Sequence, residues 1–197
     1  MEMRNLSVLA AAAFIAASTW AQGFLPELPY PGGYTFLRYE VREPGEPALG
    51  WILEVVPKEE GAYEVRMTMV SEVSDTEGFS LLKTFMGAGT LEGGADVIPL
   101  APIFSLWDKE IEAGKSYLLR ERARLITERE DEILGIPVVV GTYVHPLFPR
   151  QRAVIYLPRL SHRALLLFPP YIRVEEKADG EYRLVQEIEL VEFVHED

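Results

Sequence analysis

The sequence predicts a mainly β fold, an antiparallel meander that forms a curved sheet or half-barrel with one short helix. Apolar and polar residues alternate through 34–73 in three consecutive runs. The segments between these runs carry proline and glycine, the residues that preset turn geometry. Near the C-terminus, Asp179-Gly180 separates two further alternating runs, which is a strong β-hairpin signal.

The first three strands are predicted at 35–42, 49–57 and 63–73. A period of two places one set of side chains on a core and the other set towards water. The breaks at 43–47 and 57–61 contain the proline and glycine typical of turns. In the third run the apolar set is Tyr63, Val65, Met67, Met69 and Val73, and it alternates with Glu64, Arg66, Thr68 and Glu72.

A short helix is predicted from about Glu77 to Met86. Residues 74–76 offer N-cap side chains, apolar residues then recur at helical spacing, and Gly87 and Gly89 end the pattern. The glycines that follow lack the lysine and the hydroxyl residue of a phosphate-binding loop, so a plain loop is expected.

The apolar segment 97–107 is interrupted by Pro99 and Pro102, which favours an edge strand or an irregular buried loop. It is the best candidate in the chain for the wall of an apolar pocket or for a lid, and a loop packed on the core is the alternative. The predicted ligand-lining residues are Trp51, Val97, Ile98, Leu100, Ile103, Phe104 and Trp107.

The segment 116–131 fits two interpretations. Its arginines and glutamates are good helix formers, but its apolar residues also alternate as in a long strand with ion pairs on the outer side. Its place between turns in a β-rich chain favours the strand. Further strands are predicted at 133–144, 153–157, 164–168, 171–176 and 181–194.

The start of the chain predicts a signal peptide at 1–21. Arg4 precedes an alanine-rich apolar run, and small residues stand at Thr19 and Ala21, as cleavage after Ala21 requires. A retained membrane anchor is the alternative, but the run is shorter than the roughly 20 residues of a spanning helix. Beyond the signal we expect a proline- and glycine-rich lead-in at 22–33, a single β-rich domain at 34–197 and no transmembrane segment.

Composition restricts partners and chemistry. The formal net charge of −12 repels nucleic acid and anionic membrane surfaces, so neither is an expected partner. The chain has no cysteine, which excludes disulfides, thiol nucleophiles and thiolate metal sites. One asparagine (Asn5), an excess of arginine over lysine and 14 prolines favour a thermophilic source.

No residue pattern indicates catalysis, and we predict that the protein is not an enzyme and holds no metal or cofactor. His145, His162 and His195 match no two-histidine metal spacing, and His195 is expected to lie in a disordered tail. Ser80 lacks the second glycine of a nucleophile elbow. Carboxylates are abundant, but most alternate outward on predicted strands.

Four features together resemble uncharacterised exported β-sheet proteins of bacterial envelopes: the signal peptide, the meander, the segment Gly135–Tyr143 and a terminal strand with Glu189-Leu190. Those proteins carry a comparable Pro-x-Gly-Thr-(Tyr/Phe) strand and are likened to periplasmic lipoprotein carriers, which are half-barrels. This chain departs from the pattern in having three valines between Pro137 and Gly141, and in lacking the Trp and Gly of the later strand. The resemblance implies a fold and an envelope location, and it transfers no functional residue.

The leading functional hypothesis is an exported protein, periplasmic or extracellular, that binds a lipid or acyl chain in the curved sheet. The alternative is a structural or protein-interaction module of the envelope that uses a sheet edge or the lead-in. A hydrolase with a carboxylate pair ranks last.

Overall fold

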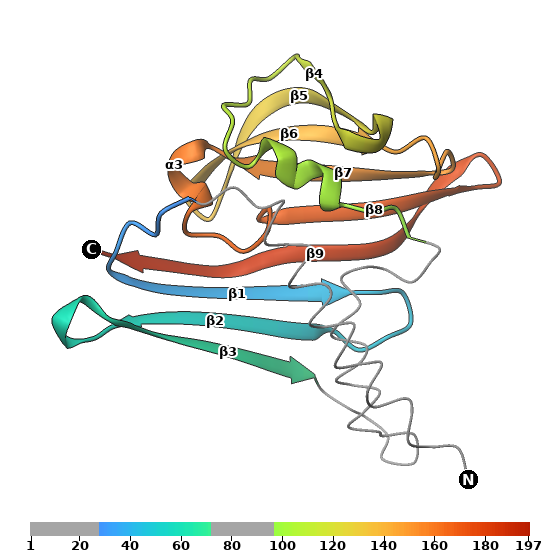
Figure 1. The fold of residues 1–197 in the computed structure, drawn as a ribbon. Helices are drawn as coiled ribbons and strands as arrows, with labels where there is room; N and C mark the ends of the chain where they lie inside the picture. Colours follow the sequence, from blue (N-terminus) through green and yellow to red (C-terminus); the bar gives the residue numbers. More distant parts are fainter. Residues whose placement is uncertain (1–27, 72–96) are drawn as a thin grey trace, which may run out of the picture.

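The computed structural model describes residues 28–71 and 97–197, which form one antiparallel sheet of nine strands in the order β3-β2-β1-β9-β8-β7-β6-β5-β4 (Figure 1). Within these residues the sheet is not closed, because β3 and β4 lie at its two edges. This confirms the predicted mainly β fold. The predicted signal peptide and the predicted helix at 77–86 lie outside the described residues. The strands are β1 Tyr34–Arg42, β2 Leu49–Pro57, β3 Tyr63–Ser71, β4 Ser116–Leu118, β5 Arg124–Ile133, β6 Ile136–Val144, β7 Gln151–Pro158, β8 Tyr171–Ala178 and β9 Glu181–Glu196.

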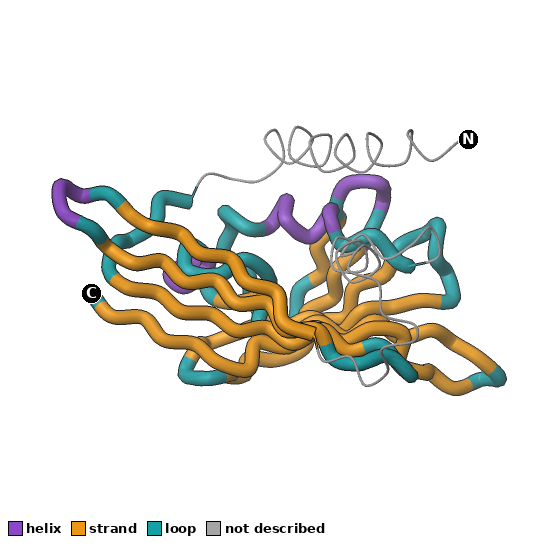
Figure 2. The backbone as a smooth tube through the Cα atoms, turned by 90° about the horizontal axis from the view of Figure 1, so that it is seen from below, coloured by secondary structure: helices purple, strands orange, loops and turns teal. Residues whose placement is uncertain are grey.

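Two meanders meet at the first and last strands. Every neighbouring pair joins strands that are consecutive in sequence, except β1 and β9. These two pair antiparallel from Tyr34 opposite Glu196 to Arg42 opposite Glu187, with one bulge. The long β9 therefore joins β1–β3 to β4–β8 in one sheet. Figure 2 shows that this sheet is bent and that the 3₁₀ helix η2 (Ala101–Leu106) lies over its concave side.

The predicted hairpin at Asp179-Gly180 is confirmed. Both residues have positive φ, 53° and 90°, as a two-residue turn of this hand requires. The same geometry occurs at Leu134 (φ 51°) and Gly135 (φ 78°). The single strand expected at 133–144 is therefore wrong at its start, because Ile133 ends β5 and Leu134-Gly135 forms the turn into β6.

The strand interpretation of 116–131 is confirmed, with an interruption. The 3₁₀ turn η3 (Arg120–Arg122) separates β4 from β5, and Glu121 and Arg122 have φ of 57° and 61°. β5 has a bulge at Glu128, and beside Gly141 the backbones of β5 and β6 lie close together. A Cβ at Gly141 would lie 2.8 Å from the Ile126 carbonyl oxygen, so glycine is needed there.

The strand predicted at 164–168 does not form. The short helix α3 (Leu160–Arg163) precedes it, and the amides of Leu165 and Leu166 bond back to His162 and Arg163 as in turns. Both leucines are nevertheless buried. The strand was predicted because residues 164–168 are apolar. An apolar run is equally compatible with an irregular loop that packs into the core.

The expectation of a disordered tail at His195 is wrong. His195 lies in β9 opposite Thr35, and its Nδ1 is 3.0 Å from Thr35 Oγ1 and 3.2 Å from the Tyr34 carbonyl oxygen. The strand expected at 181–194 extends to Glu196 because β1 supplies a partner strand along that length.

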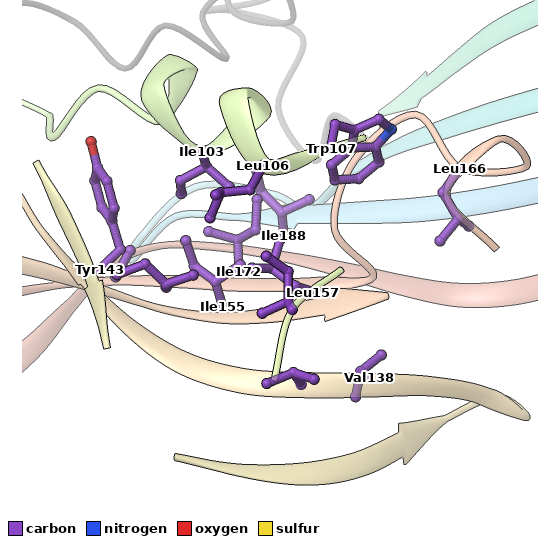
Figure 3. Close-up of a cluster of buried hydrophobic side chains, with 14 of the residues drawn as sticks. Ile103, Leu106, Trp107, Val138, Tyr143, Ile155, Leu157, Leu166, Ile172 and Ile188 are labelled. Carbon is purple, nitrogen blue, oxygen red and sulfur yellow. The ribbon is translucent and has the colours of Figure 1, made fainter. Parts of the chain in front are cut away.

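The hydrophobic core lies between the concave side of the sheet, here called the inner face, and the segment 97–111 (Figure 3). Tyr39 of β1 and Leu190 of β9 lie opposite each other on this face. The inner-facing residues of the other central strands that are fully or almost fully buried are Leu125, Val139, Tyr143, Ala153, Ile155, Leu157, Ile172, Val174 and Ile188.

Within the described part of the chain, no helix is long and apolar enough to cross a bilayer.

Candidate functional site

The segment 97–111 covers the inner face rather than forming an edge strand. Ile98, Ile103, Leu106 and Trp107 are buried against the sheet, and the last three are seen above it in Figure 3. The sequence allowed either an edge strand or an irregular buried loop here, and the structure shows the buried loop. Among the predicted lining residues, Ile98, Ile103 and Trp107 fill the core, whereas Val97, Leu100 and Phe104 are only partly buried against it.

Side chains of the sheet hold the beginning of this covering segment. The Tyr143 hydroxyl donates to the Pro99 carbonyl oxygen at 2.7 Å, and the Ile98 amide donates to Gln151 Oε1 at 2.7 Å. Burial raises the pKa of Tyr143, so its hydroxyl stays protonated and remains a donor. These bonds satisfy backbone groups that no strand partner reaches.

Arg163 holds the end of the covering segment. Its side chain is 1% exposed, and its guanidinium donates to the carbonyl oxygens of Leu106 (2.7 Å), Trp107 (3.1 Å) and Pro158 (2.7 Å), and also to that of Lys109. Burial lowers the pKa of this group, yet a guanidinium remains charged at physiological pH. The segment thus packs as a layer of the core, and Arg163 holds its end.

The inner face continues beyond this cover onto β2 and β3. The register places Val65 opposite Val55, Met67 opposite Leu53 and Met69 opposite Trp51. The side chains of β3 are nevertheless exposed: Val65 by 60%, Met67 by 69% and Met69 by 46%. We call this region the open inner face, which comprises Trp51, Leu53, Tyr63, Val65, Met67 and Met69.

The open inner face is uncharged, and the neighbouring charges lie on the opposite side of the sheet. Arg66 pairs there with Glu64 at 2.7 Å and with Glu54 at 2.9 Å, and Lys58 also pairs with Glu64. Hydrogen bonds from Arg66 and then from Lys58 lower the pKa of Glu64 to about 2. The two faces of β3 therefore differ sharply in polarity.

Trp51 marks the boundary between the filled core and the open inner face. Its ring lies 5.8 Å from that of Phe168, which in turn lies 5.9 Å from Tyr39. Its indole nitrogen is buried without a hydrogen-bond partner among the described residues. Trp51 is the one predicted lining residue that lies on the open inner face.

Sequence reasoning did not select Tyr63, Val65, Met67 and Met69 as site residues. Their alternation placed them correctly on the core side of β3, but alternation is the same for a covered and an uncovered strand. Two consecutive inward methionines were the available signal, because methionine is common at adaptable binding surfaces.

The histidines have structural partners. The buried His145 accepts the Leu147 amide at Nδ1 (3.3 Å), so its Nε2 carries the proton and donates to Glu121 at 3.2 Å. Across 28–71 and 97–197, no group of three histidine or carboxylate side chains is placed to hold a metal ion.

Comparison with known proteins adds little to this geometry. No protein-family model matches the chain, and no curated protein matches it either. Among solved structures, the crystal structure of MucB is similar with a TM-score of 0.43 and 12% identity, over 92% of this chain and 59% of that one. The chain thus spans less than two thirds of MucB. A likeness of this degree carries no argument about function.

Proposed function

We propose that this chain is an exported, non-catalytic protein of the cell envelope that binds the acyl chain of a lipid on its open inner face. The observation that carries the proposal is the row Tyr63, Val65, Met67 and Met69, which faces the core side of the sheet and yet stays exposed. Export rests on the signal-peptide pattern at residues 1–21.

An acyl chain suits this surface physically. Burying a valine or methionine side chain contributes about 1.5–3 kcal/mol, so a ligand that covers Val65, Met67 and Met69 gains a substantial hydrophobic term. Methionine has flexible torsions and a polarisable sulfur, which lets it pack against chains of varied shape. None of the described residues that face inward on β2 and β3 is charged, and this disfavours a strongly polar ligand there.

Trp51 has a buried hydrogen-bond donor at the end of this surface, with no acceptor among the described residues. An unsatisfied buried donor costs about 1–3 kcal/mol. In the structure this nitrogen is closed off from the surface, so an ester or carboxyl oxygen of a lipid would become its acceptor only after a rotation of the Trp51 side chain that exposes it.

The first test is native mass spectrometry of the protein purified from an exporting host, followed by organic extraction of bound material. A lipid of defined mass supports the proposal. A clean apo mass that does not shift when palmitate or phospholipid is added contradicts it.

Point variants test the location of binding. Met67→Lys places a charge on the open inner face and is expected to weaken palmitate binding at least about tenfold, because the ammonium group must stay hydrated. Thr68→Lys is the matched control, since Thr68 is exposed on the opposite face of the same strand. Fluorescence titration measures both, and equal affinities would place the ligand elsewhere.

The second candidate function is a protein-interaction module of the envelope. The observation that favours it is that β3 lies at an edge of the sheet. An apo protein that ignores lipids but is recovered in a stable cross-linked complex with an envelope protein would make this the leading interpretation.

A further inference from the structure

The two edges of the sheet are unequal. β4 has only three residues, whereas β3 has nine and pairs with β2 along its whole length without a register shift. On its other side, β3 has no partner strand within the described part of the chain (Figure 1). Natural proteins protect free edges with short strands, prolines, inward-pointing charges or bulges. β4 has the first of these protections, whereas β3 is long and has no proline, no inward-pointing charge and no bulge.

The side chains of β3 complement those of a second β3 strand that runs antiparallel. With a two-fold axis at Val65, Glu64 of each copy faces Arg66 of the other, so two pairs of opposite charge form on the outer face. On the inner face, Tyr63 of each copy faces Met67 of the other, an aromatic–sulfur pair. Val65 lies at the centre and faces its own equivalent.

Neighbouring registers lack this complementarity. An axis at Glu64 places two glutamates opposite each other, and an axis at Arg66 places two arginines opposite each other, which destabilises an antiparallel pair. An axis at Met67 places Glu64 opposite Val70 and Arg66 opposite Thr68, so no opposite charges meet.

We propose that two copies of this chain associate through β3, antiparallel and centred on Val65, and join their sheets across a two-fold axis. The open inner faces of the two copies then become continuous. The proposal concerns the strand edge and the outer-face charges, and it stands independently of lipid binding.

Single-cysteine variants test the register directly, because the chain contains no cysteine of its own. Val65→Cys places two thiols opposite each other, where Cβ atoms lie about 4.5–5.5 Å apart and a disulfide needs only a small adjustment. Val70→Cys is the control on the same strand. In the proposed dimer its two copies are ten positions apart along the strand, or about 33 Å.

The two variants are oxidised mildly at physiological ionic strength, where charges more than about 8 Å apart are screened. Val65→Cys is expected to form the cross-linked dimer at least about tenfold faster than Val70→Cys. Equal rates for the two variants, or no cross-linked Val65→Cys, would overturn the proposal. Both valines are exposed, by 60% and 48%, so neither substitution removes core packing.

Charge reversal tests the same contact without touching the inner face. Glu64→Arg creates two arginine pairs across the axis and is expected to weaken the dimer about tenfold in analytical ultracentrifugation. The double variant Glu64→Arg with Arg66→Glu restores opposite charges and is expected to recover most of the affinity.

Failure of the double variant to recover affinity, or a monomeric wild-type chain at every concentration examined, would contradict the dimer. Thermal unfolding of each variant reports changes within the monomer separately. Palmitate binding is expected to be unchanged in all the charge variants, because their side chains lie on the outer face. Failure of the dimer is thereby distinguished from failure of the proposed function.

Discussion

At the scale of single residues, the charged side chains of this protein are ordered by the two faces of the sheet. Arg42 contacts Glu40 and Glu189 at 2.7 Å and Glu187 at 3.2 Å on the outer face. Glu175 lies between Arg152 (2.8 Å) and Arg173 (2.9 Å). Glu175 is buried, whereas the Arg42 side chain is 40% exposed. Exposed pairs contribute little individually, and networks that share a charge contribute more.

Glu64 provides a pH-dependent test of one of these groups. Its folded pKa of about 2 lies below its ordinary value, because Arg66 and Lys58 donate hydrogen bonds to the carboxylate. A lowered folded pKa stabilises the fold above the ordinary value of about 4.3, and this contribution is lost as the pH falls towards about 2.

Replacing Arg66 with Gln removes the hydrogen bond that lowers the pKa of Glu64 most. The titration midpoint of the Glu64 carboxyl is therefore expected to rise towards its ordinary value. Carboxyl-carbon NMR titration measures it in both proteins. A wild-type midpoint near 4.3, or one that Arg66→Gln leaves unchanged, would be inconsistent with the pairing seen here.

At the scale of elements, the covering segment 97–111 depends on side chains that come from elsewhere in the chain. Tyr143 and Gln151 hold its beginning, and Arg163 holds its end. A segment with two prolines cannot form a regular strand ladder, so its backbone groups need such partners. The tyrosine of the Gly-Thr-Tyr sequence at 141–143 therefore has a structural role.

Arg163→Met is expected to destabilise the protein by about 3–5 kcal/mol, because several buried carbonyl oxygens lose a charged donor together. Arg183→Met is the matched control and is expected to change stability by less than about 0.5 kcal/mol, since the Arg183 side chain is 65% exposed and pairs only weakly with Asp179. Urea unfolding measures both. A small effect at Arg163 would mean that packing alone holds the covering segment.

At the scale of the whole molecule, the sheet is one continuous structure because β1 pairs with β9. Its stability comes without disulfides, from a core beneath 97–111 and from ion-pair networks on the outer face. The arginine-rich composition and the proline content favour adaptation to high temperature.

Thermal unfolding of the purified protein tests this last prediction. A melting temperature above the range of about 45–65 °C that is usual for mesophilic domains is expected. Raising the salt concentration should lower it, because salt screens exposed ion pairs. A midpoint inside the mesophilic range would count against a thermophilic source.

Much of the fold could be predicted from local patterns. Alternation identified β1–β3 and the long strands near the C-terminus, and Asp179-Gly180 identified the final hairpin. The errors came where local patterns are ambiguous: a turn of Leu134-Gly135 inside a β-branched run, and an apolar loop at 164–168 mistaken for a strand. The order of His195 depended on β1, a partner more than 150 residues away in sequence.

For the candidate site too, some properties follow from the sequence and others only from the tertiary structure. The sequence by itself determined which side chains share a face, because the period of two is a local property of extended backbone. Only the tertiary structure decided which part of that face is covered. The covering segment extends over the central strands and leaves the inner-facing side chains of β3 exposed, and that outcome depends on contacts between residues far apart in the chain.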